Sequence, residues 1–319
     1  MALFLSEDDV QQLLSMSLAL DAVESVHRAL SLGQASDVPR QRSRLPQTTL
    51  HILQGALPTQ DVIGYKAYTS NRSGVRFLLH LYSASTGCLR AVFEADRLGM
   101  MRTAAASGVA TRWLARPDAE VAGVFGAGWQ AEGHIEALAA VRPLRRVKVY
   151  VRNRPRLEAF CSLMSERIGV DVVAADSPEE TVRASDIVST ITTSATPLFD
   201  ADWLSPGTHI NAAGSNSLIR RELGEDVLKR CRTIVVDSVD AALHEAGDLL
   251  PLFEKGRLHA RQLLELGDVI AGHRDGRLAA EDITLFESQG MAIQDLGVAA
   301  RLDVLAREHG LGVELPYGK

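Results

Sequence analysis

The sequence predicts an α/β protein with two domains, one built on a parallel sheet and the other an α+β domain with an antiparallel sheet. Three observations lead to this prediction. The chain has 319 residues, enough for two domains at roughly 150 residues each. Between residues 121 and 237 short apolar segments alternate with helical ones, which is typical of a parallel sheet covered on both faces. Between residues 62 and 93 β-rich segments are separated only by turns, which is typical of antiparallel strands.

The first domain is expected to begin with two helices. Ser6 can cap a helix that carries Val10, with Asp9 at the capping-box position. A second helix is expected at residues 19–32, ended by Gly33. Strands follow at residues 62–68, 77–82 and 89–93, and a helix of small residues covers 102–114.

The second domain is expected to begin after Pro117, where strands and helices alternate. The expected strands are residues 121–125, 147–151, 170–174, 187–191, 209–213 and 233–237, and the expected helices are 129–141, 156–168 and 178–184. A long helix is expected at residues 291–309. We therefore expect one domain at residues 1–115, joined by the C-terminal segment 291–319, and a second domain at residues 116–290.

Composition excludes several classes of protein. The chain is 46% hydrophobic with a net charge of −6, which argues against disorder and against a nucleic-acid partner. No run of about 18 apolar residues is present, so no membrane span or membrane partner is expected. The first residues lack a basic segment and turn acidic at once, so we expect a cytoplasmic protein. Three widely spaced cysteines predict neither a disulfide framework nor a metal site.

A glycine-rich loop is the sharpest local signal in the chain. Gly126, Ala127 and Gly128 follow an apolar strand and open a helix that begins with Trp129 and Gln130. Glycine permits the tight turn and lets backbone N–H groups reach a pyrophosphate at the helix N-terminus. Ala131 takes the third position of the motif, a tolerated replacement for glycine. The context of strand, loop and helix predicts a Rossmann dinucleotide-binding domain.

The end of the second strand of this domain indicates which dinucleotide is preferred. An NAD site places an aspartate or glutamate there for the ribose 2′-hydroxyl. Here Arg152, Asn153 and Arg154 occupy the segment, with no acid. Arginine suits a 2′-phosphate through charge-assisted, bidentate contacts. The segment therefore favours NADP(H), with NAD(H) as the alternative.

Several motifs together resemble the ornithine cyclodeaminase/μ-crystallin family. The glycine loop, Gly126-Ala-Gly-Trp-Gln-Ala131, is similar to the family's G-x-G-x-Q-A signature. Further segments resemble family motifs, in family order and over most of the chain: Gly64-Tyr-Lys66, Met101-Arg-Thr-Ala-Ala-Ala106, Pro206-Gly-Thr-His-Ile-Asn-Ala-Ala-Gly214, Glu245-Ala-Gly-Asp248 and Thr284-Leu-Phe-Glu-Ser-Gln-Gly-Met-Ala-Ile-Gln-Asp295. The resemblance implies that the first domain binds substrate and forms a homodimer, and that the second binds the cofactor.

The resemblance also assigns site residues. Lys66 matches the catalytic lysine of the family, and Arg102 matches the arginine that holds the substrate carboxylate. A second carboxylate arginine matches Arg42, with Arg44 as a close competitor. Residues in the positions of family cofactor contacts are Thr103, Gly126, Ala127, Gly128, Trp129, Gln130, Arg152, Asn153, Arg154, Thr192, Ala213 and Ser288. Glu245 and Asp295 lie in family motifs without an assigned role.

One departure separates the possible activities. Similar cyclodeaminases carry a catalytic aspartate where this chain has Asn216, and an amide cannot act as a general base. We therefore expect an NADPH-dependent reductase of small cyclic ketimines, such as Δ1-pyrroline-2-carboxylate and Δ1-piperideine-2-carboxylate. The alternatives are an NAD-dependent ornithine cyclodeaminase, an amino-acid dehydrogenase acting on alanine, and a non-catalytic NADPH-binding protein.

Overall fold

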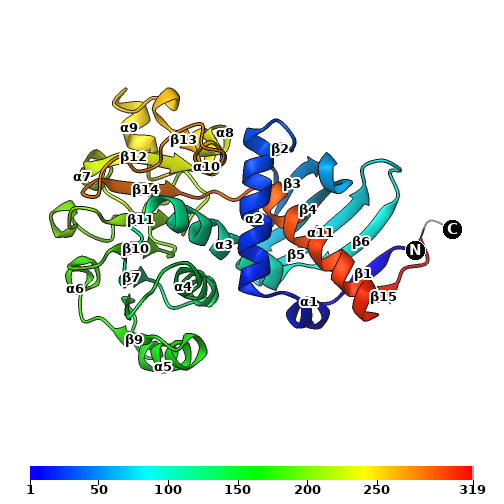
Figure 1. Ribbon diagram of the computed structural model, residues 1–319, viewed down its shortest axis with the longest axis horizontal. Helices are drawn as coiled ribbons and strands as arrows, with labels where there is room; N and C mark the ends of the chain where they lie inside the picture. The colour runs from blue at the N-terminus through cyan, green and yellow to red at the C-terminus, as the bar shows by residue number, and fades with distance from the viewer. Residues whose placement is uncertain (318–319) are drawn as a thin grey trace. The chain divides into compact units, whose positions relative to one another are not determined.

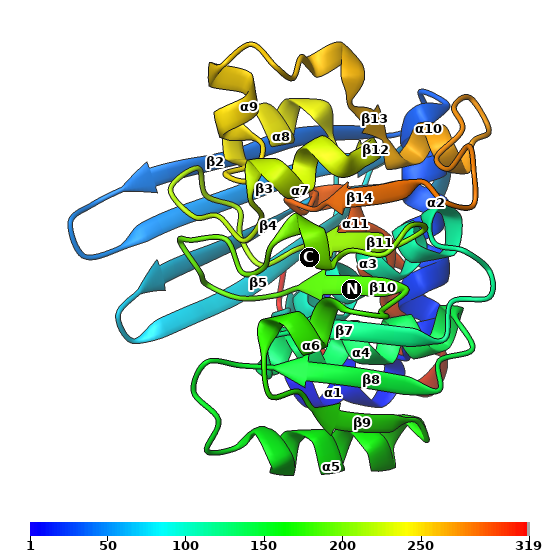
Figure 2. The same ribbon diagram turned by 90° about the vertical axis from the view of Figure 1, so that its left-hand side faces the viewer.

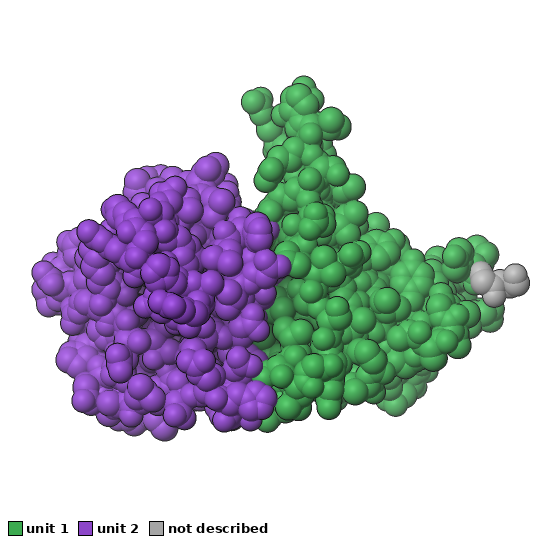
Figure 3. Space-filling view, turned by 90° about the horizontal axis from the view of Figure 1, so that it is seen from above, with its two compact units in different colours: residues 1–102, 291–319 green, residues 103–290 purple. Residues whose placement is uncertain are grey.

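The computed structural model describes residues 1–317 and divides the chain into two compact units (Figure 3). Unit 1 comprises residues 1–102 and the chain from Met291 onward, and unit 2 comprises residues 103–290. The division falls inside helix α3 (Asp96–Leu114), whereas the sequence placed a boundary after residue 115. The first turn of α3 is tied to the N-terminal segment, because the Glu7 carboxylate accepts hydrogen bonds from the backbone N–H groups of Asp96 and Arg97.

Unit 1 is built on a seven-stranded sheet with the order β15-β1-β6-β5-β4-β3-β2 (Figure 1). All neighbouring strands are antiparallel except β1 and β6. The elements are β1 (Leu3–Leu5), α1 (Glu7–Leu13), α2 (Met16–Ser31), β2 (Ser36–Arg44), β3 (Thr49–Leu57), a 3-10 turn (Pro58–Gln60), β4 (Val62–Asn71), β5 (Gly74–Ser83), β6 (Leu89–Glu94), the start of α3, α11 (Ala292–His309) and β15 (Val313–Glu314). Ser6 caps α1 in a capping box with Asp9, as the sequence predicts.

Helix α11 returns from the end of the chain to cover one face of this sheet and packs against α2 (Figure 1). Its approach is close at three glycines. A Cβ on Gly55 would lie 3.0 Å from Ile293 Cγ2, and one on Gly64 would lie 2.8 Å from Leu296 Cδ2. A Cβ on Gly297 of α11 itself would lie 2.5 Å from Val26 Cγ1 of α2. The glycines therefore let the helix sit directly on its neighbours.

Unit 2 contains an eight-stranded, fully parallel sheet with the order β13-β12-β14-β11-β10-β7-β8-β9 (Figure 2). Its strands are β7 (Val121–Phe125), β8 (Arg146–Tyr150), β9 (Asp171–Ala174), β10 (Ile187–Thr190), β11 (His209–Ala212), β12 (Cys231–Val236), β13 (Leu264–Glu265) and β14 (Ile283–Glu287). Its helices are the rest of α3, α4 (Trp129–Val141), α5 (Leu157–Ile168), α6 (Pro178–Val182), α7 (Glu225–Arg230), α8 (Val239–Glu245), α9 (Leu250–Glu254) and α10 (Leu266–Ile270), with 3-10 turns at Ala201–Trp203 and Ala260–Gln262. The predicted fold class is confirmed.

Both faces of the parallel sheet are buried, as continuous apolar strands require. Ala122 and Val124 of β7 join one cluster of buried side chains, which includes Ile135 of α4, whereas Phe125 joins another. The strand order turns around β7, since β8 lies on one side of it and β10 on the other. In open sheets of this kind, ligands bind beyond the carboxyl ends of the strands at such a point.

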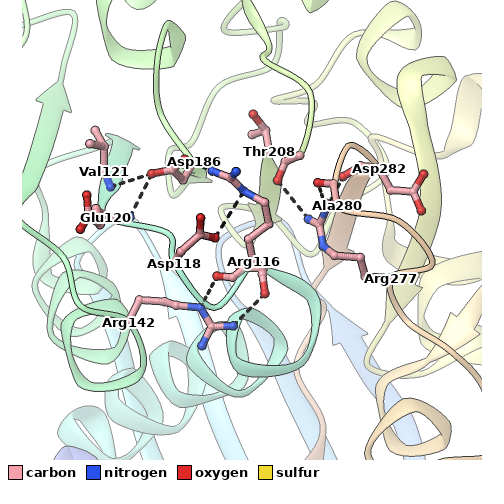
Figure 4. A network of polar contacts seen from close by, with 12 residues as sticks. Arg116, Asp118, Glu120, Val121, Arg142, Asp186, Thr208, Arg277, Ala280 and Asp282 are labelled. Atoms are coloured by element: carbon pink, nitrogen blue, oxygen red, sulfur yellow. Dashed lines mark hydrogen bonds and ion pairs between the residues drawn. The ribbon is translucent and has the colours of Figure 1, made fainter.

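The amino edge of the parallel sheet is closed by arginines that hold backbone carbonyls (Figure 4). Arg142 donates to the carbonyls of Thr111, Arg112, Ala115 and Arg116 at the end of α3. These contacts satisfy acceptors that a helix C-terminus leaves open and place a cation there. Nearby, Arg277 donates in the same manner to the carbonyls of Leu114, Gly207 and Asp282, whereas Arg116 forms an ion pair with the Asp186 carboxylate. We assign this edge a structural role.

No helix between residues 1 and 317 has both the length and the apolar character to cross a membrane. Over the same residues, no group of three or more histidine, cysteine, aspartate or glutamate side chains is arranged to hold a metal ion. Cys88, Cys161 and Cys231 are all free thiols.

Candidate active site

Lys66 lies in the middle of strand β4 on the face that α11 covers. Only 2% of its surface is exposed, which is rare for lysine unless it is paired. Its Nζ lies 2.7 Å from Oδ2 of Asp295, in the first turn of α11. It also lies 5.5 Å from the centre of the Phe77 ring. Strand β4 thus places the ammonium group of Lys66 beside the first turn of helix α11.

Asp295 joins this lysine to Arg102. Arg102 Nε donates to Asp295 Oδ1 over 2.9 Å, and its Nη1 donates to Gln294 Oε1 over 3.0 Å. Gln294 continues the network, because its amide nitrogen lies 3.0 Å from Nε2 of His27 on α2. All five side chains are buried and belong to unit 1. The sequence singled out Lys66 and Arg102, but it gave no role to Asp295 and did not identify Gln294 or His27.

The environment of Lys66 changes its acidity. The pKa of the ammonium group is lowered from its ordinary value to about 7: burial is the main cause, the charge of Arg102 adds to the lowering, and Asp295 partly opposes both. The charge of Arg40 lowers it as well. A lysine in these surroundings exchanges a proton near neutral pH, which a solvated lysine cannot do.

The arginine whose charge reaches Lys66 from β2 is Arg40, which the sequence did not select. The pairing of β2 with β3 shifts between Val38 and Gln41, so Arg40 lies in an irregular stretch. Arg42 pairs with His51, which pairs with Tyr68, two positions along β4 from Lys66. Arg44 pairs with Thr49 and is exposed, two positions further away. Along the sheet, Arg40 therefore lies nearest to Lys66, Arg42 lies further away, and Arg44 lies furthest.

The glycine loop of unit 2 has the geometry of an anion cradle. Gly126 adopts φ 118°, and a Cβ there would lie 2.6 Å from the carbonyl oxygen of Ile191. Gly128 caps α4 without a side-chain hydrogen bond, and a Cβ there would meet nothing within 4 Å. Oε1 of Gln130, in the first turn, is buried without a hydrogen-bond partner among residues 1–317. The loop therefore leaves a helix N-terminus open to a ligand.

The segment after β8 exposes the side chains of Arg152, Asn153 and Arg154. Arg154 Nη1 lies 2.9 Å from Asp176 Oδ1, in the segment that follows β9. That ion pair is largely solvated, with 42% and 85% of the two side chains exposed, so it leaves Arg154 available to a stronger anion.

Two of the remaining predicted cofactor contacts in unit 2, Thr192 and Ser288, donate hydrogen bonds to buried carboxylates. Thr192 donates to Glu222 through both its backbone N–H and its hydroxyl. Ser288 donates its hydroxyl to Asp237 over 3.0 Å. Ala213 is held differently, because its N–H donates to the Thr190 carbonyl over 3.0 Å. Thr103 belongs to unit 2 as its first residue, beside Arg102, the last residue of the N-terminal part of unit 1.

Comparison with known proteins gives one family. The model of the ornithine cyclodeaminase/mu-crystallin family matches residues 1–306. A Δ1-pyrroline-2-carboxylate reductase of Bacillus cereus is 32% identical over 330 residues, which cover 99% of this chain and 100% of the relative.

Two solved structures are similar over nearly the whole chain. The Δ1-pyrroline-2-carboxylate reductase of Thermococcus litoralis, in complex with NADH and L-proline, superposes with a TM-score of 0.94 at 31% identity, covering 98% of this chain and 100% of that one. An archaeal alanine dehydrogenase dimer with bound NAD superposes with a TM-score of 0.94 at 33% identity, covering 99% of each chain.

Proposed function

The chain belongs to the ornithine cyclodeaminase/mu-crystallin family, and on that premise we propose that it is a nicotinamide-dependent reductase of small cyclic ketimines. The substrates we propose are α-imino carboxylates of the Δ1-pyrroline-2-carboxylate and Δ1-piperideine-2-carboxylate type. Two similar proteins are reductases of the first of these compounds, and one of them was solved with L-proline, the reduced product.

The observation that carries this proposal is the buried cluster of Lys66, Asp295 and Arg102. Reduction of a C=N bond adds a hydride to carbon and a proton to nitrogen. Lys66 supplies the proton, because burial and the charge of Arg102 bring its pKa to about 7. Asp295 holds Lys66 and Arg102 in one arrangement through its two oxygens. General acids with a pKa near the working pH are the most effective.

The substrate carboxylate needs fixed positive charge. Arg102 uses Nε and Nη1 to hold Asp295 and Gln294, and its Nη2 is the nitrogen that neither of them occupies. We assign Nη2 to the substrate carboxylate, with Arg40 or Arg42 of β2 as the second donor, since the Arg40 charge reaches Lys66. Arg44 is the weakest of these candidates because it is exposed at the end of the strand.

The cofactor site lies in unit 2. The open helix N-terminus at Gly128 and the close approach at Gly126 fit a pyrophosphate. Gly126, Ala127, Gly128, Trp129 and Gln130 would hold it. The hydride for the C=N carbon is the chemistry that a bound nicotinamide supplies.

For the choice of cofactor we favour NADPH. Arg152 and Arg154 are exposed at the end of β8, where an NAD site carries an acid. Replacing both by alanine should lower kcat/KM for NADPH by about tenfold or more, since charge-assisted hydrogen bonds are lost, and should leave kcat/KM for NADH within about twofold. Steady-state kinetics with each cofactor measures this. A wild-type enzyme that prefers NADH by tenfold would contradict the preference, and the similar structures do contain NADH or NAD.

A cofactor-oxidation screen tests the reaction itself. Purified protein is incubated with NADPH or NADH and with each cyclic ketimine, and separately with pyruvate plus ammonia. Turnover on a ketimine supports the proposal, and no turnover with either ring size refutes it. Reduction of pyruvate plus ammonia would instead establish an alanine dehydrogenase, the second candidate, which the similarity to the archaeal enzyme favours.

Cyclisation of ornithine is less consistent with the chain. Asn216 lies in the loop after β11, where similar cyclodeaminases carry a catalytic aspartate. A neutral amide cannot accept a proton at working pH. Ammonia release from ornithine with catalytic NAD⁺ would nevertheless assign that activity.

The macromolecular partner that we propose is a second copy of this chain. The sheet face opposite Lys66 exposes Leu50, Ile63 and Leu78, which are 37%, 46% and 43% exposed. Strand pairing puts all three on one face, where Tyr65 stacks on His80 with ring centres 4.7 Å apart. A face with several large exposed apolar side chains can mark an interaction surface, and the similar archaeal enzyme is a dimer.

A further inference from the structure

Two neighbouring loops at the carboxyl edge of the parallel sheet share one anchor. Thr192 follows β10 and Gly214 follows β11, and these strands are adjacent in the sheet. The loops carry two of the predicted cofactor contacts, Thr192 and Ala213. Whatever fixes these loops relative to each other therefore shapes this part of the cofactor site.

The anchor is the carboxylate of Glu222. Its Oε1 accepts hydrogen bonds from the Thr192 N–H and the Thr192 hydroxyl, both over 2.6 Å. Its Oε2 accepts from the Gly214 N–H over 3.0 Å. A Cβ on residue 214 would collide with this carboxylate, so glycine is required for the contact. Three donors converge on one side chain that is 1% exposed.

Glu222 is itself held in place. Asp248 Oδ1 accepts from the backbone N–H groups of Glu222 and Leu223 over 2.7 and 2.6 Å. The Glu222 carbonyl accepts from the Leu198 N–H over 2.8 Å. The backbone of Glu222 therefore cannot shift without breaking these bonds, and its side chain holds the two loops at a fixed position.

We propose that Glu222 is a positioning residue for the nicotinamide cofactor, which it serves by fixing the Thr192 and Gly214 loops in the arrangement that binds. The inference rests on the cofactor site of the proposed function. Glu222 acts through the loops and not by touching the reacting atoms.

The ionised form of Glu222 is the one that can hold both loops. A protonated carboxyl would direct a hydrogen toward one of the three donors and lose that contact. The pKa of Glu222 is raised to about 7, chiefly by burial and also by the charge of Asp248, while the hydrogen bonds from Thr192 oppose the rise. Glu287, whose pKa burial raises well above its ordinary value, also faces Glu222. Cofactor affinity should therefore fall as the pH drops below about 7.

The test is cofactor binding by the full chain carrying Glu222→Gln. Dissociation constants for NADH and NADPH are measured by fluorescence titration on both sides of about pH 7. Wild type should bind more weakly at the acidic end. The variant should bind about tenfold or more weakly at the alkaline end, because an amide offers one acceptor oxygen where the carboxylate has two. Its affinity for NADH, which has no 2′-phosphate to titrate in this range, should not depend on pH.

Glu225→Gln is the matched control, since Glu225 lies nearby in sequence but forms a partly exposed ion pair with Lys255. It should keep both the affinity and the pH dependence of wild type. Wild-type behaviour of Glu222→Gln would overturn the proposal. If Glu222→Gln does not fold, Thr192→Val removes one of the three donors, and unchanged cofactor affinity in that variant would overturn the proposal equally.

Amide hydrogen exchange separates this inference from the proposed function. In cofactor-free protein, the amides of Thr192 and Gly214 should exchange faster in Glu222→Gln than in wild type. Unchanged exchange would refute the anchor itself. Faster exchange in a protein whose wild type binds neither cofactor would refute the proposed function, and with it the cofactor role of Glu222, while the anchor would stand.

Discussion

Lys66 shows how the surroundings of one residue change its chemistry. A lysine on a sheet is ordinarily solvated and charged, but this one is 2% exposed, is paired with Asp295, and has its pKa lowered by the charge of Arg102. In the same cluster the planar group of Arg102 contacts two acceptors at once, a geometry that a lysine side chain does not reproduce.

Lys66→Met should lower kcat for ketimine reduction by about 10²-fold or more, the usual size of a general-acid contribution. Methionine keeps the apolar length of the side chain and leaves Asp295 paired with Arg102. Lys229→Met, at a lysine with 53% of its side chain exposed, is the control and should retain wild-type turnover. Near-wild-type turnover in Lys66→Met would return Lys66 to a structural role.

The pH profile tests the same residue independently. Since the pKa of Lys66 is lowered to about 7, the fraction that carries a proton falls above that pH. With saturating cofactor, kcat/KM for reduction should therefore decline by about tenfold per pH unit above about 7. Lys66→Met should lack this descending limb. A profile that stays flat to about pH 9 in wild type would show that Lys66 is not the acid.

At the scale of elements, packing of α11 on α2 and the sheet builds the Lys66 cluster. Asp295 and Gln294 lie in the first turns of α11, so the position of the helix sets their position. A glycine in the middle of a helix costs roughly 0.5–1 kcal/mol relative to alanine. Gly297 is used nevertheless, because Val26 of α2 occupies the place of a side chain.

Gly297→Val should lower the free energy of unfolding by about 1–3 kcal/mol, the range for overpacking a core. It should also reduce turnover, since it displaces α11 and with it Asp295. Thermal unfolding followed by circular dichroism measures the first effect. Val304→Ala, on the exposed side of the same helix, should change stability by no more than about 0.5 kcal/mol. An unchanged melting temperature in Gly297→Val would mean that α11 has room to adjust.

Charged side chains pair backbone groups at both edges of the parallel sheet. At the amino edge, Arg142 and Arg277 donate to backbone carbonyls. At the carboxyl edge, Glu222 and Asp237 accept from the N–H groups of loops. Both follow from the same requirement, that buried backbone groups be paired. The carboxyl edge carries the predicted cofactor contacts, so its carboxylates bear on binding as well as on stability.

At the scale of the whole molecule, the exposed apolar face of the antiparallel sheet predicts a homodimer. Ile63→Glu combined with Leu78→Glu should give a monomer, because each copy would bury charges against the other. Size-exclusion chromatography with light scattering measures the mass. Leu278→Glu, at a residue of unit 2 that is 61% exposed, should leave the dimer intact. A dimer that survives the double change uses another surface, and a monomeric wild type would refute the proposal.

Local signals made much of the fold predictable. The alternation of apolar and helical segments predicted the parallel sheet, and the glycine loop at residues 126–128 predicted a cofactor site. Four strands of unit 1 (β1, β2, β3 and β15) and two strands of unit 2 (β13 and β14) were not predicted. Strand β2 reads Ser-Asp-Val-Pro-Arg-Gln-Arg-Ser-Arg, which is polar and contains proline, so its composition gives no sign of a strand.

The sequence by itself determined the fold class and the family, and it predicted Lys66 and Arg102 as site residues, because each depends on a pattern or a motif that is local in the chain. Only the tertiary structure decided what surrounds them. Asp295 lies 193 positions from Arg102 in the chain, and no spacing rule connects them. Arg40 lies in an irregularly paired stretch of β2, and its charge lowers the pKa of Lys66, although the sequence had selected Arg42 and Arg44. Contacts of this kind depend on strand register and helix packing, which no single segment of the chain specifies by itself.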